Sequence, residues 1–181
     1  MKEKLIKILY LLVKDSPLLS FPYLNKLRNL VYSHYLGANN INIATRVSIA
    51  KAHFAKSSTT IIDNEFRVGQ DAKIDITGGG ITGVNATISE GVKVYNDHVI
   101  DGEHEDWRKQ DIIASPLKID DFAWLGANCI INSSVSKIGK GAIIAAGAVV
   151  TRRFLTLRLM AGVSAKLVCY RKISTTQNNE Q

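Results

Sequence analysis

Cysteine, proline and aromatic residues are scarce in this sequence of 181 residues, which contains two cysteines, three prolines and 7% aromatic residues. Cys129 and Cys169 lie far apart, and no small-x-small cleavage site follows the apolar start of the chain. The sequence therefore predicts neither a secreted disulfide framework nor a cysteine-type zinc site. We expect a cytoplasmic protein in a reducing setting, with no bound metal.

A long hydrophobic run is also missing. The apolar segment at residues 5–13 is interrupted by Lys7 and is too short to span a bilayer. Residues 1–36 have a helical pattern, punctuated by Pro17 and Pro22. One apolar stripe of such a helix consists of Leu5, Ile8, Leu9 and Leu12. The stripe either packs on the body of the protein or lies on the inner face of a membrane, and packing is favoured because terminal amphipathic helices usually dock.

The charge balance is basic, with 23 Lys and Arg against 16 Asp and Glu, a formal net charge of +7. Such a charge favours anionic partners, of which nucleic acid, a membrane and a phosphorylated cofactor all qualify. The basic residues are scattered and lack the aromatic interleaving of RNA-binding surfaces. Nucleic acid is therefore not a predicted partner.

Aliphatic residues recur at six-residue intervals over about a hundred residues, a period that suits neither a helix nor an ordinary strand. The recurring positions are Ile43 and Ile49; Ile62, Val68 and Ile74; Ile88 and Val94; Ile113, Ile119, Leu125 and Ile131; and Ile138, Ile144 and Val150. Four residues after many of them stand compact side chains, namely Val47, Ala72, Val92, Ala123, Cys129, Ala142 and Ala148.

Both offsets fit a coil with three flat faces of about six residues each, in which the aliphatic side chains point inward and stack on their equivalents one coil away. Compact residues are needed where the chain turns inside a narrow prism. An antiparallel sandwich with strands spaced by chance is disfavoured because the two offsets repeat together.

The frame slips by one residue in three places: between Ala55 and Ile62, around residues 78–81, and between Ile131 and Ile138. Such slips predict bulges at corners. A larger break at about residues 95–117 is dense in ionisable groups and predicts a functional loop outside the coil. The expected organisation is a helical segment at 1–38, the coil at 39–151 and a carboxy-terminal extension at 152–181, with a disordered polar tail from Ser174.

Two ordered segments carry a family resemblance: IDDFAWLGAN at residues 119–128 and IGKGAIIAAGAVVT at residues 138–151. With the histidine-bearing loop before them, they resemble the last coils of the hexapeptide-repeat acyltransferases, especially the maltose and galactoside acetyltransferases and the O-acetyltransferases of bacterial surface polysaccharides. The resemblance implies an all-β, left-handed parallel β-helix. It also implies a homotrimer in which acetyl-coenzyme A lies in a groove between the coils of two subunits.

Site residues follow from the resemblance by position. The general base is His98, at the end of VYNDH (residues 94–98). Contacts to acetyl-coenzyme A are expected at Ala127, Ala146, Thr151 and Arg152, and at Lys166 near the nucleotide end. Asn85 and Asp97 are the candidates for contacting the acceptor.

Alternatives remain open at several of these positions. His104 lies in the same loop and is the second candidate base. Asn85 has a turn role as an equal alternative. Asp97, with Asp101, is near enough in sequence to orient an imidazole, although loop carboxylates are most often solvated.

Other conspicuous residues have structural interpretations. His34 and His53 are expected to be structural and Cys129 a packed thiol. Trp124 is expected to point outward and to line the subunit interface or the cofactor groove. Asp120 and Asp121 are expected to form only a turn. The run of glycines at 78–80 lacks the strand-to-helix context and the Lys-Ser/Thr pair of a phosphate loop.

The implied activity is acetyl-coenzyme A-dependent O-acetylation of a sugar hydroxyl in a bacterial surface polysaccharide or its precursor, by direct transfer with histidine as base. Two alternatives stand beside it. One is N-acetylation of a nucleotide-linked amino sugar, and the other is a non-catalytic β-helix that serves as an assembly or zinc-binding module.

Overall fold

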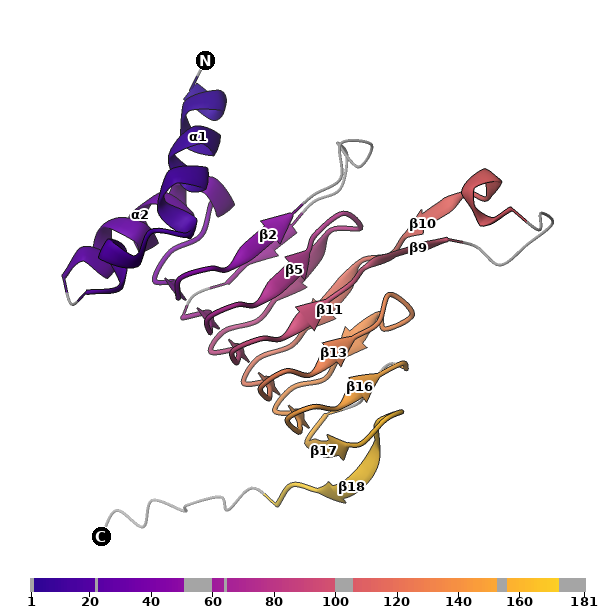
Figure 1. Ribbon diagram of the computed structural model, residues 1–181. Helices are drawn as coiled ribbons and strands as arrows, with labels where there is room; N and C mark the ends of the chain where they lie inside the picture. Colours follow the sequence, from indigo (N-terminus) through magenta and orange to yellow (C-terminus); the bar gives the residue numbers. More distant parts are fainter. Residues whose placement is uncertain are drawn as a thin grey trace, which may run out of the picture.

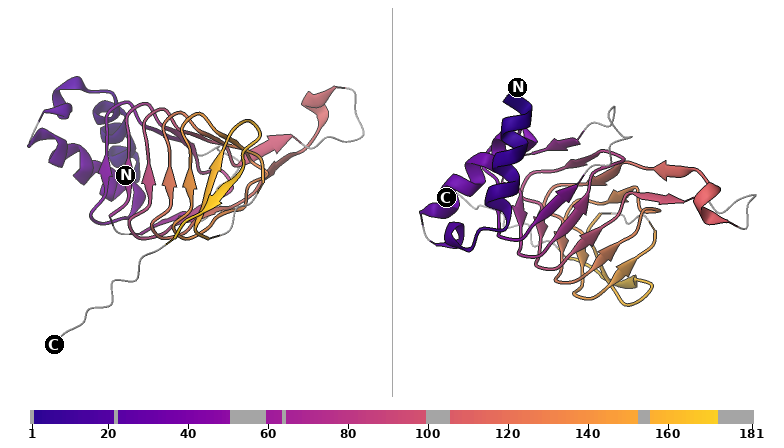
Figure 2. Two further views of the ribbon diagram at one scale, coloured as in Figure 1. Left: turned by 90° about the horizontal axis from the view of Figure 1, so that it is seen from below. Right: turned by 45° about the horizontal axis from the view of Figure 1, so that its top comes forward.

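The repeating part of the chain winds through three sheets of mainly parallel strands, and each of the first four coils contributes one strand to each sheet (Figure 1). The computed structural model describes residues 2–21, 23–50, 60–63, 65–99, 106–152 and 156–172. Two helices lie at one end of this prism and an antiparallel pair of strands extends from its side (Figures 1 and 2). The architecture is a parallel β-helix, as the six-residue period predicts.

The three faces are called sheets A, B and C in the order in which a coil meets them. Sheet A contains β1 (Asn42–Ile43), β4 (Arg67–Val68), β7 (Thr87–Ile88), β12 (Trp124–Leu125), β15 (Ile143–Ile144), β17 (Arg158–Ala161) and β18 (Lys166–Tyr170). Sheet B contains β2 (Ser48–Ala50), β5 (Lys73–Asp75), β8 (Lys93–Val94), β13 (Ile130–Ile131) and β16 (Val149–Val150). Sheet C contains β3 (Thr60–Ile62), β6 (Gly80–Thr82), β11 (Leu117–Ile119) and β14 (Lys137–Ile138).

The predicted aliphatic residues form columns inside the prism. On sheet A the strands pair in register, so that the inward residues stack in the order Ile43, Val68, Ile88, Leu125 and Ile144. Each of these side chains is at most 3% exposed. One predicted hexad residue is misplaced: Ile113 lies in the strand pair beside the prism and is 40% exposed, because the chain has left the coil at that point.

At two of the three corners the chain turns from one sheet to the next over a constant number of residues, which explains why the six-residue period is regular there. In each of these turns, the third residue after the inward-facing residue of the preceding strand has a positive φ. These residues are Arg46, Asp71, Gly91, Asn128 and Gly147 between sheets A and B, and Glu65, Asn85, Phe122 and Gly141 between sheets C and A. The corners are also joined from coil to coil, since the N–H of Asn128, for example, donates to the carbonyl of Glu90 at 2.9 Å. Compact residues at the offset of four, such as Ala72 and Cys129, are fully buried as predicted.

All the frame slips fall at the third corner, between sheets B and C. Between β5 and β6 the slip is two residues, not the predicted one, because the strand register places Thr82 beside Ile62 and Ile119. The largest insertion, between β8 and β11, uses the same corner (Figure 1). In the described part of the prism, extra chain between consecutive strands therefore occurs along this edge, which also carries the candidate site.

The amino-terminal helices cover the first coil. They are α1 (Lys2–Lys14) and α2 (Leu24–Leu36), separated by the 3₁₀ turn η1 (Pro17–Ser20). The hydroxyl of Tyr10 accepts from the N–H of Ile49 at 3.0 Å, that of Tyr32 donates to the carbonyl of Val47 at 3.0 Å, and Arg28 Nε donates to the carbonyl of Ile43 at 2.8 Å. These bonds satisfy main-chain groups at the exposed end of the coil, where a further copy of the strand would otherwise pair.

The apolar stripe on α1 was predicted to pack on the body of the protein, and within a single chain this prediction is wrong. Leu5, Ile8, Leu9 and Leu12 are 59%, 54%, 41% and 67% exposed. Tyr10, on the opposite side of the helix, faces the body of the protein. Its ring stacks on Tyr35 of α2, and its hydroxyl accepts from the N–H of Ile49 in the coil. The stripe therefore faces away from the body of the protein.

Candidate functional site

The feature that interrupts the coil is a strand pair formed by β9 (Asp97–Val99) and β10 (Ile112–Ala114), with a 3₁₀ turn η2 (Trp107–Lys109) between them. The strands are antiparallel, with His98 opposite Ile113 and Asp97 opposite Ala114. Where a loop was predicted, the chain thus forms a hairpin that extends well beyond the coils (Figure 2). Its main chain is held by strand pairing next to the prism, which fixes the backbone of His98.

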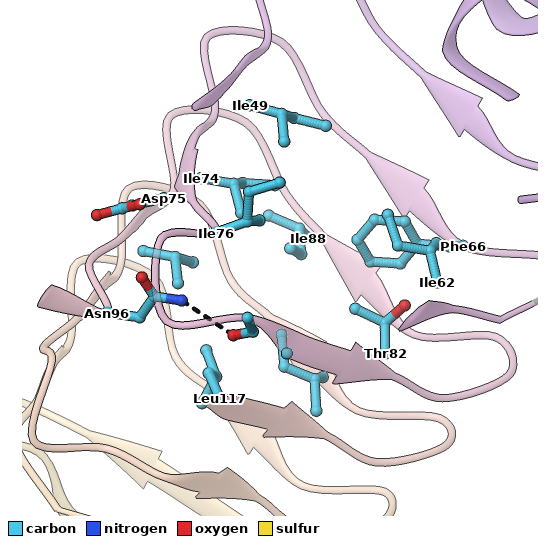
Figure 3. A pocket seen from close by; sticks show the side chains of 14 residues that line it. Ile49, Ile62, Phe66, Ile74, Asp75, Ile76, Thr82, Ile88, Asn96 and Leu117 are labelled. Atoms are coloured by element: carbon cyan, nitrogen blue, oxygen red, sulfur yellow. Dashed lines mark hydrogen bonds between the residues drawn. The ribbon is translucent and has the colours of Figure 1, made fainter. Parts of the chain in front are cut away.

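The base of the hairpin is clamped to the preceding coil by Asn96, which is 2% exposed. Its side-chain amide donates to the carbonyl of Gly79 at 3.0 Å (Figure 3). Its side-chain oxygen accepts from the N–H of Gly78 at 3.0 Å. Its carbonyl accepts from the N–H of Ser115 at 2.8 Å, where the chain returns to the coil. Both strands of the hairpin are therefore anchored at one residue, two positions before His98.

The glycine run at 78–80 has a structural purpose at this clamp. A Cβ added to Gly78 would collide with the main chain of Ser115, and one added to Gly80 would lie 2.6 Å from the carbonyl oxygen of Leu117. Only glycine allows the returning strand to approach so closely. Asn96 and this contact were not predicted from the sequence, although three glycines one coil before a large insertion are a signal of a close main-chain approach.

A small cavity of about 40 Å³ lies inside the prism near the clamp (Figure 3). Its lining is mainly aliphatic and includes Ile74, Ile88 and Leu117, with Asp75, Thr82 and Asn96 as the polar residues. The hydroxyl oxygen of Thr82 is buried and has no hydrogen-bond partner among the described residues. A space of this size, enclosed by core side chains, holds at most a few water molecules and no sugar.

The residues predicted to contact acetyl-coenzyme A lie at two different edges. Ala127 and Ala146 occur one coil apart at the corner between sheets A and B, where the carbonyl of Ala127 accepts from the N–H of Gly147 at 2.8 Å. Thr151 and Arg152 follow β16 at the corner between sheets B and C, the edge from which the hairpin leaves. Arg152 is exposed and Thr151 is half-buried.

The carboxy-terminal end adds further cationic side chains. Lys166 lies at the start of β18, opposite Ala161 of β17, and is exposed. Arg158 lies 5.3 Å from the ring centroid of Tyr170, and an Arg171 guanidinium nitrogen donates to the carbonyl of Gly141. The carboxy-terminal strand pair therefore carries cationic side chains at both of its ends.

The two residues predicted to contact the acceptor, Asn85 and Asp97, lie at different edges of the prism. Asn85 is the residue with φ of 56° at a corner between sheets C and A, so its turn role is real. Asp97 lies in β9 beside His98, and His34 is an exposed residue of α2. His53, Asp101, His104 and the tail from Ser174 fall outside the described residues.

One chain therefore does not bring all the predicted site residues together. The strand of His98 shares an edge with Thr151 and Arg152, the two alanines lie at a second edge and Asn85 at the third. Edges of one prism are separated by its faces, whereas edges of different prisms can meet when chains assemble side by side.

Two further predictions are confirmed: Cys129 is packed in the core, and Trp124 points outward. Burial raises the pKa of Cys129 to about 12, which leaves an unreactive thiol. Trp124 points outward, is 49% exposed and donates to the hydroxyl of Ser89 at 2.9 Å. Burial raises the pKa of Asp120, but hydrogen bonds from Lys137 and Lys118 outweigh it and leave the pKa below its ordinary value. Within the described ranges, no group of three or more His, Cys, Asp or Glu side chains is placed to hold a metal ion.

No model of a known protein family matches the chain. Among curated proteins, it is 46% identical over 55 residues to 2,3,4,5-tetrahydropyridine-2,6-dicarboxylate N-acetyltransferase of Staphylococcus aureus strain JH9. The match covers 30% of this chain and 23% of that protein, so the chain spans less than a quarter of the curated relative.

Solved structures match over most of the chain. A maltose O-acetyltransferase from Clostridium difficile 630 has a TM-score of 0.61 at 17% identity, covering 94% of this chain and 87% of that one. A hexapeptide-repeat acetyltransferase from Vibrio cholerae, complexed with acetyl-coenzyme A, has a TM-score of 0.56 at 19% identity and the same coverages. AntD, an N-acyltransferase from Bacillus cereus in complex with dTDP and 3-hydroxybutyryl-coenzyme A, has a TM-score of 0.60 at 17% identity over 84% of this chain and 90% of that one. These likenesses confirm, at the level of the fold, the resemblance to hexapeptide-repeat acetyltransferases.

Proposed function

We propose that this chain is an acetyl-coenzyme A-dependent acetyltransferase that acts on a sugar hydroxyl of a bacterial surface polysaccharide or its precursor. The observation that carries the proposal is the hairpin. A β-helix with the fold of hexapeptide-repeat acetyltransferases is interrupted at a single edge, and the inserted strand begins with Asp97 and His98 directly after a buried anchor. A scaffold that served only assembly would not need a clamped excursion rich in ionisable residues.

In this proposal His98 is the general base. Its neutral imidazole takes the proton of the acceptor hydroxyl as the oxygen attacks the thioester carbonyl, and a carbon–oxygen bond forms. The carbon–sulfur bond then breaks, and the imidazolium returns the proton to the departing thiolate of coenzyme A. No acyl-enzyme is needed, in keeping with the raised pKa of the buried Cys129 thiol.

The cofactor binds along the last coils. Ala127 and Ala146 leave room for the pantetheine arm, and a main-chain N–H of the coil stabilises the negative charge that grows on the carbonyl oxygen. Arg152 and Lys166 are both exposed and supply charge-assisted contacts to the phosphates of coenzyme A.

The active assembly in this proposal is a homotrimer of left-handed prisms in the cytoplasm. The distribution of the candidates supports it, because the edge of His98 and the edge of Asn85 come together only between neighbouring chains. Asn85 then presents its side chain to the acceptor from the turn that its positive φ defines, and Asp97 contacts the acceptor from the hairpin.

N-acetylation of a nucleotide-linked amino sugar is the second candidate. It is supported by AntD, a variant of which was crystallised with dTDP-4-amino-4,6-dideoxyglucose and coenzyme A, and by the N-acetyltransferase match. The same base serves both reactions, because either acceptor loses a proton on acylation.

The test is release of coenzyme A thiol from acetyl-coenzyme A with a panel of hydroxyl and amino sugars, with the acceptor-free reaction as the blank. We expect acceptor-dependent release with a product that mild alkali hydrolyses, as for an ester. An alkali-stable product would identify the amide of the second candidate. No release with any acceptor, together with no binding of coenzyme A by calorimetry, would leave a non-catalytic module and contradict the proposal.

A further inference from the structure

The outward side of α1 and α2 is a continuous apolar surface. We call it the outer helical surface and define it by the exposed side chains Leu5, Ile8, Leu9, Leu12, Leu27 and Leu30, which are between 41% and 67% exposed. Both helices bind the coil through their opposite sides, by the hydrogen bonds of Tyr10, Arg28 and Tyr32. The outer helical surface is therefore left without a partner in the chain while the helices remain fixed to the prism.

A groove of about 350 Å³ joins the two helices across this surface. It is lined by Ile6, Leu9, Val13, Leu27, Leu30, Val31 and His34. Only the last of these side chains is polar. Apolar surface thus extends from the stripe on α1 across the groove to the ridge of α2, well beyond the scattered single residues that soluble surfaces usually expose.

Basic residues border this surface. By helical spacing, Lys4 lies beside the apolar stripe of α1 and Lys26 lies beside Leu30 of α2, whereas Lys7 lies on the far side of α1 from the stripe. All three are exposed. Lys26 Nζ also lies 5.9 Å from the ring centroid of Tyr23, an aromatic side chain that is 81% exposed. Residues 1–36 carry six basic and two acidic residues, a net +4 of the chain's +7.

An apolar centre with a lysine border and an exposed tyrosine fits the boundary between lipid head groups and acyl chains. A second copy of the chain fits less well, because two such surfaces in contact would bring the lysine borders of both copies together. None of the described helices is long and apolar enough to cross a membrane. With 13 residues, α1 spans only about 20 Å, so the helix would lie in the plane of the surface.

We propose that the outer helical surface docks this protein on a membrane that contains anionic lipid, with α1 in the interface, its leucines among the acyl chains and its lysines at the phosphates. Docking holds the prism at the membrane by one end, which suits an acceptor that is itself attached to a membrane. The binding does not depend on transferase activity.

The experiment is sedimentation of the full chain with vesicles of phosphatidylcholine, with and without phosphatidylglycerol. We expect binding only with phosphatidylglycerol, weakened by salt because surface charges are screened. Leu12→Glu should weaken binding by about ten-fold or more, since a buried leucine is replaced by a charge. Lys4→Ala should weaken it by about five-fold, the contribution of one lysine near an anionic surface.

Val168→Glu is the matched control. It makes the same change in charge at a 59% exposed position of β18, far from α1, and should leave vesicle binding unchanged. Circular dichroism and light scattering check that each variant keeps the fold and the assembly. The proposal is wrong if the wild type ignores anionic vesicles at low salt, or if Leu12→Glu binds them as tightly as Val168→Glu. It is also wrong if Leu12→Glu breaks up a lipid-free assembly of copies, since the surface is then an interface between chains.

Discussion

Replacing Asn96 by alanine tests whether the hairpin is held by the clamp. The side chain satisfies two main-chain groups at once, the N–H of Gly78 and the carbonyl of Gly79, in a place where Asn96 itself is 2% exposed. Asn96→Ala leaves the N–H of Gly78 without its partner, whereas the carbonyl of Gly79 still accepts from the N–H of Leu117 at 3.3 Å. Leaving one buried polar group unpaired costs about 1–3 kcal/mol, so we expect the substitution to lower the free energy of unfolding by about that amount. Because the same residue anchors the strand of His98, kcat should also fall by about ten- to a hundred-fold, the cost of a small displacement of a catalytic group.

Urea denaturation at one fixed protein concentration measures the stability, and steady-state kinetics with acetyl-coenzyme A measures kcat. Asn132→Ala is the matched control, because Asn132 lies at the same edge one coil later but its side chain bonds, among the described residues, only to the adjacent Ser133. Its effect should stay within about 0.5 kcal/mol. If Asn96→Ala is no more destabilising than Asn132→Ala, the clamp contributes nothing and the reasoning fails. If it is destabilising but kcat is unchanged, the clamp supports the fold and not the site.

Three further predictions concern the core, the cofactor and the assembly. Thr82→Val should raise the free energy of unfolding by about 1 kcal/mol, because it removes a buried hydroxyl without a partner. Thr45→Val should lower it by a similar amount, because Thr45 is 3% exposed and its hydroxyl accepts from Gln70 at 3.1 Å; equal effects in chemical denaturation would contradict the assignment. Arg152→Ala and Lys166→Ala should each weaken coenzyme A binding in calorimetry, as should added salt, and unchanged affinities would remove both residues from the cofactor site. Light scattering should give three times the chain mass of 19.9 kDa, and a monomer at micromolar concentration would count against a shared site.

The coil was predictable because the same packing requirements recur in every coil. A narrow prism requires an aliphatic side chain such as Leu125 to stack on Ile88 and Ile144, and it requires compact side chains such as Ala72 at the corners. Two corners also have a fixed length, so the six-residue period survives there. Any sequence that satisfies both conditions over several coils has few other folds available.

The variable corner was not predictable in detail. Insertions between sheets B and C obey no period, so the sequence could not show that Thr82 takes the inward place two residues late, or that Ile113 belongs to a hairpin. The stripe on α1 was misjudged for a different reason. Amphipathicity shows that a helix has an apolar side but not what covers it, and here the aromatic ring of Tyr10 on the other side docks instead.

The site was predictable only as a set of positions. Strand order shows that His98 and Arg152 share an edge, whereas Asn85 and Ala146 occupy the other two. The sequence of one chain does not predict which edges of neighbouring prisms lie together, because this arrangement depends on the contact between subunits. The clamp residue Asn96 escaped notice because its partners are main-chain groups of glycines, which leave little trace in a sequence.

The central proposal is that His98 is the general base. The most direct test compares the turnover of His98→Ala with that of His104→Ala. His98→Ala should reduce kcat by about a hundred- to ten-thousand-fold while coenzyme A affinity and the assembly stay nearly unchanged, whereas His104→Ala should do much less. In the wild type the rate should fall on the acid side, since a protonated imidazole accepts no proton. A His98→Ala protein that assembles normally, binds coenzyme A and keeps more than about a third of wild-type turnover would contradict the account, because even weak general-base catalysis predicts a larger loss.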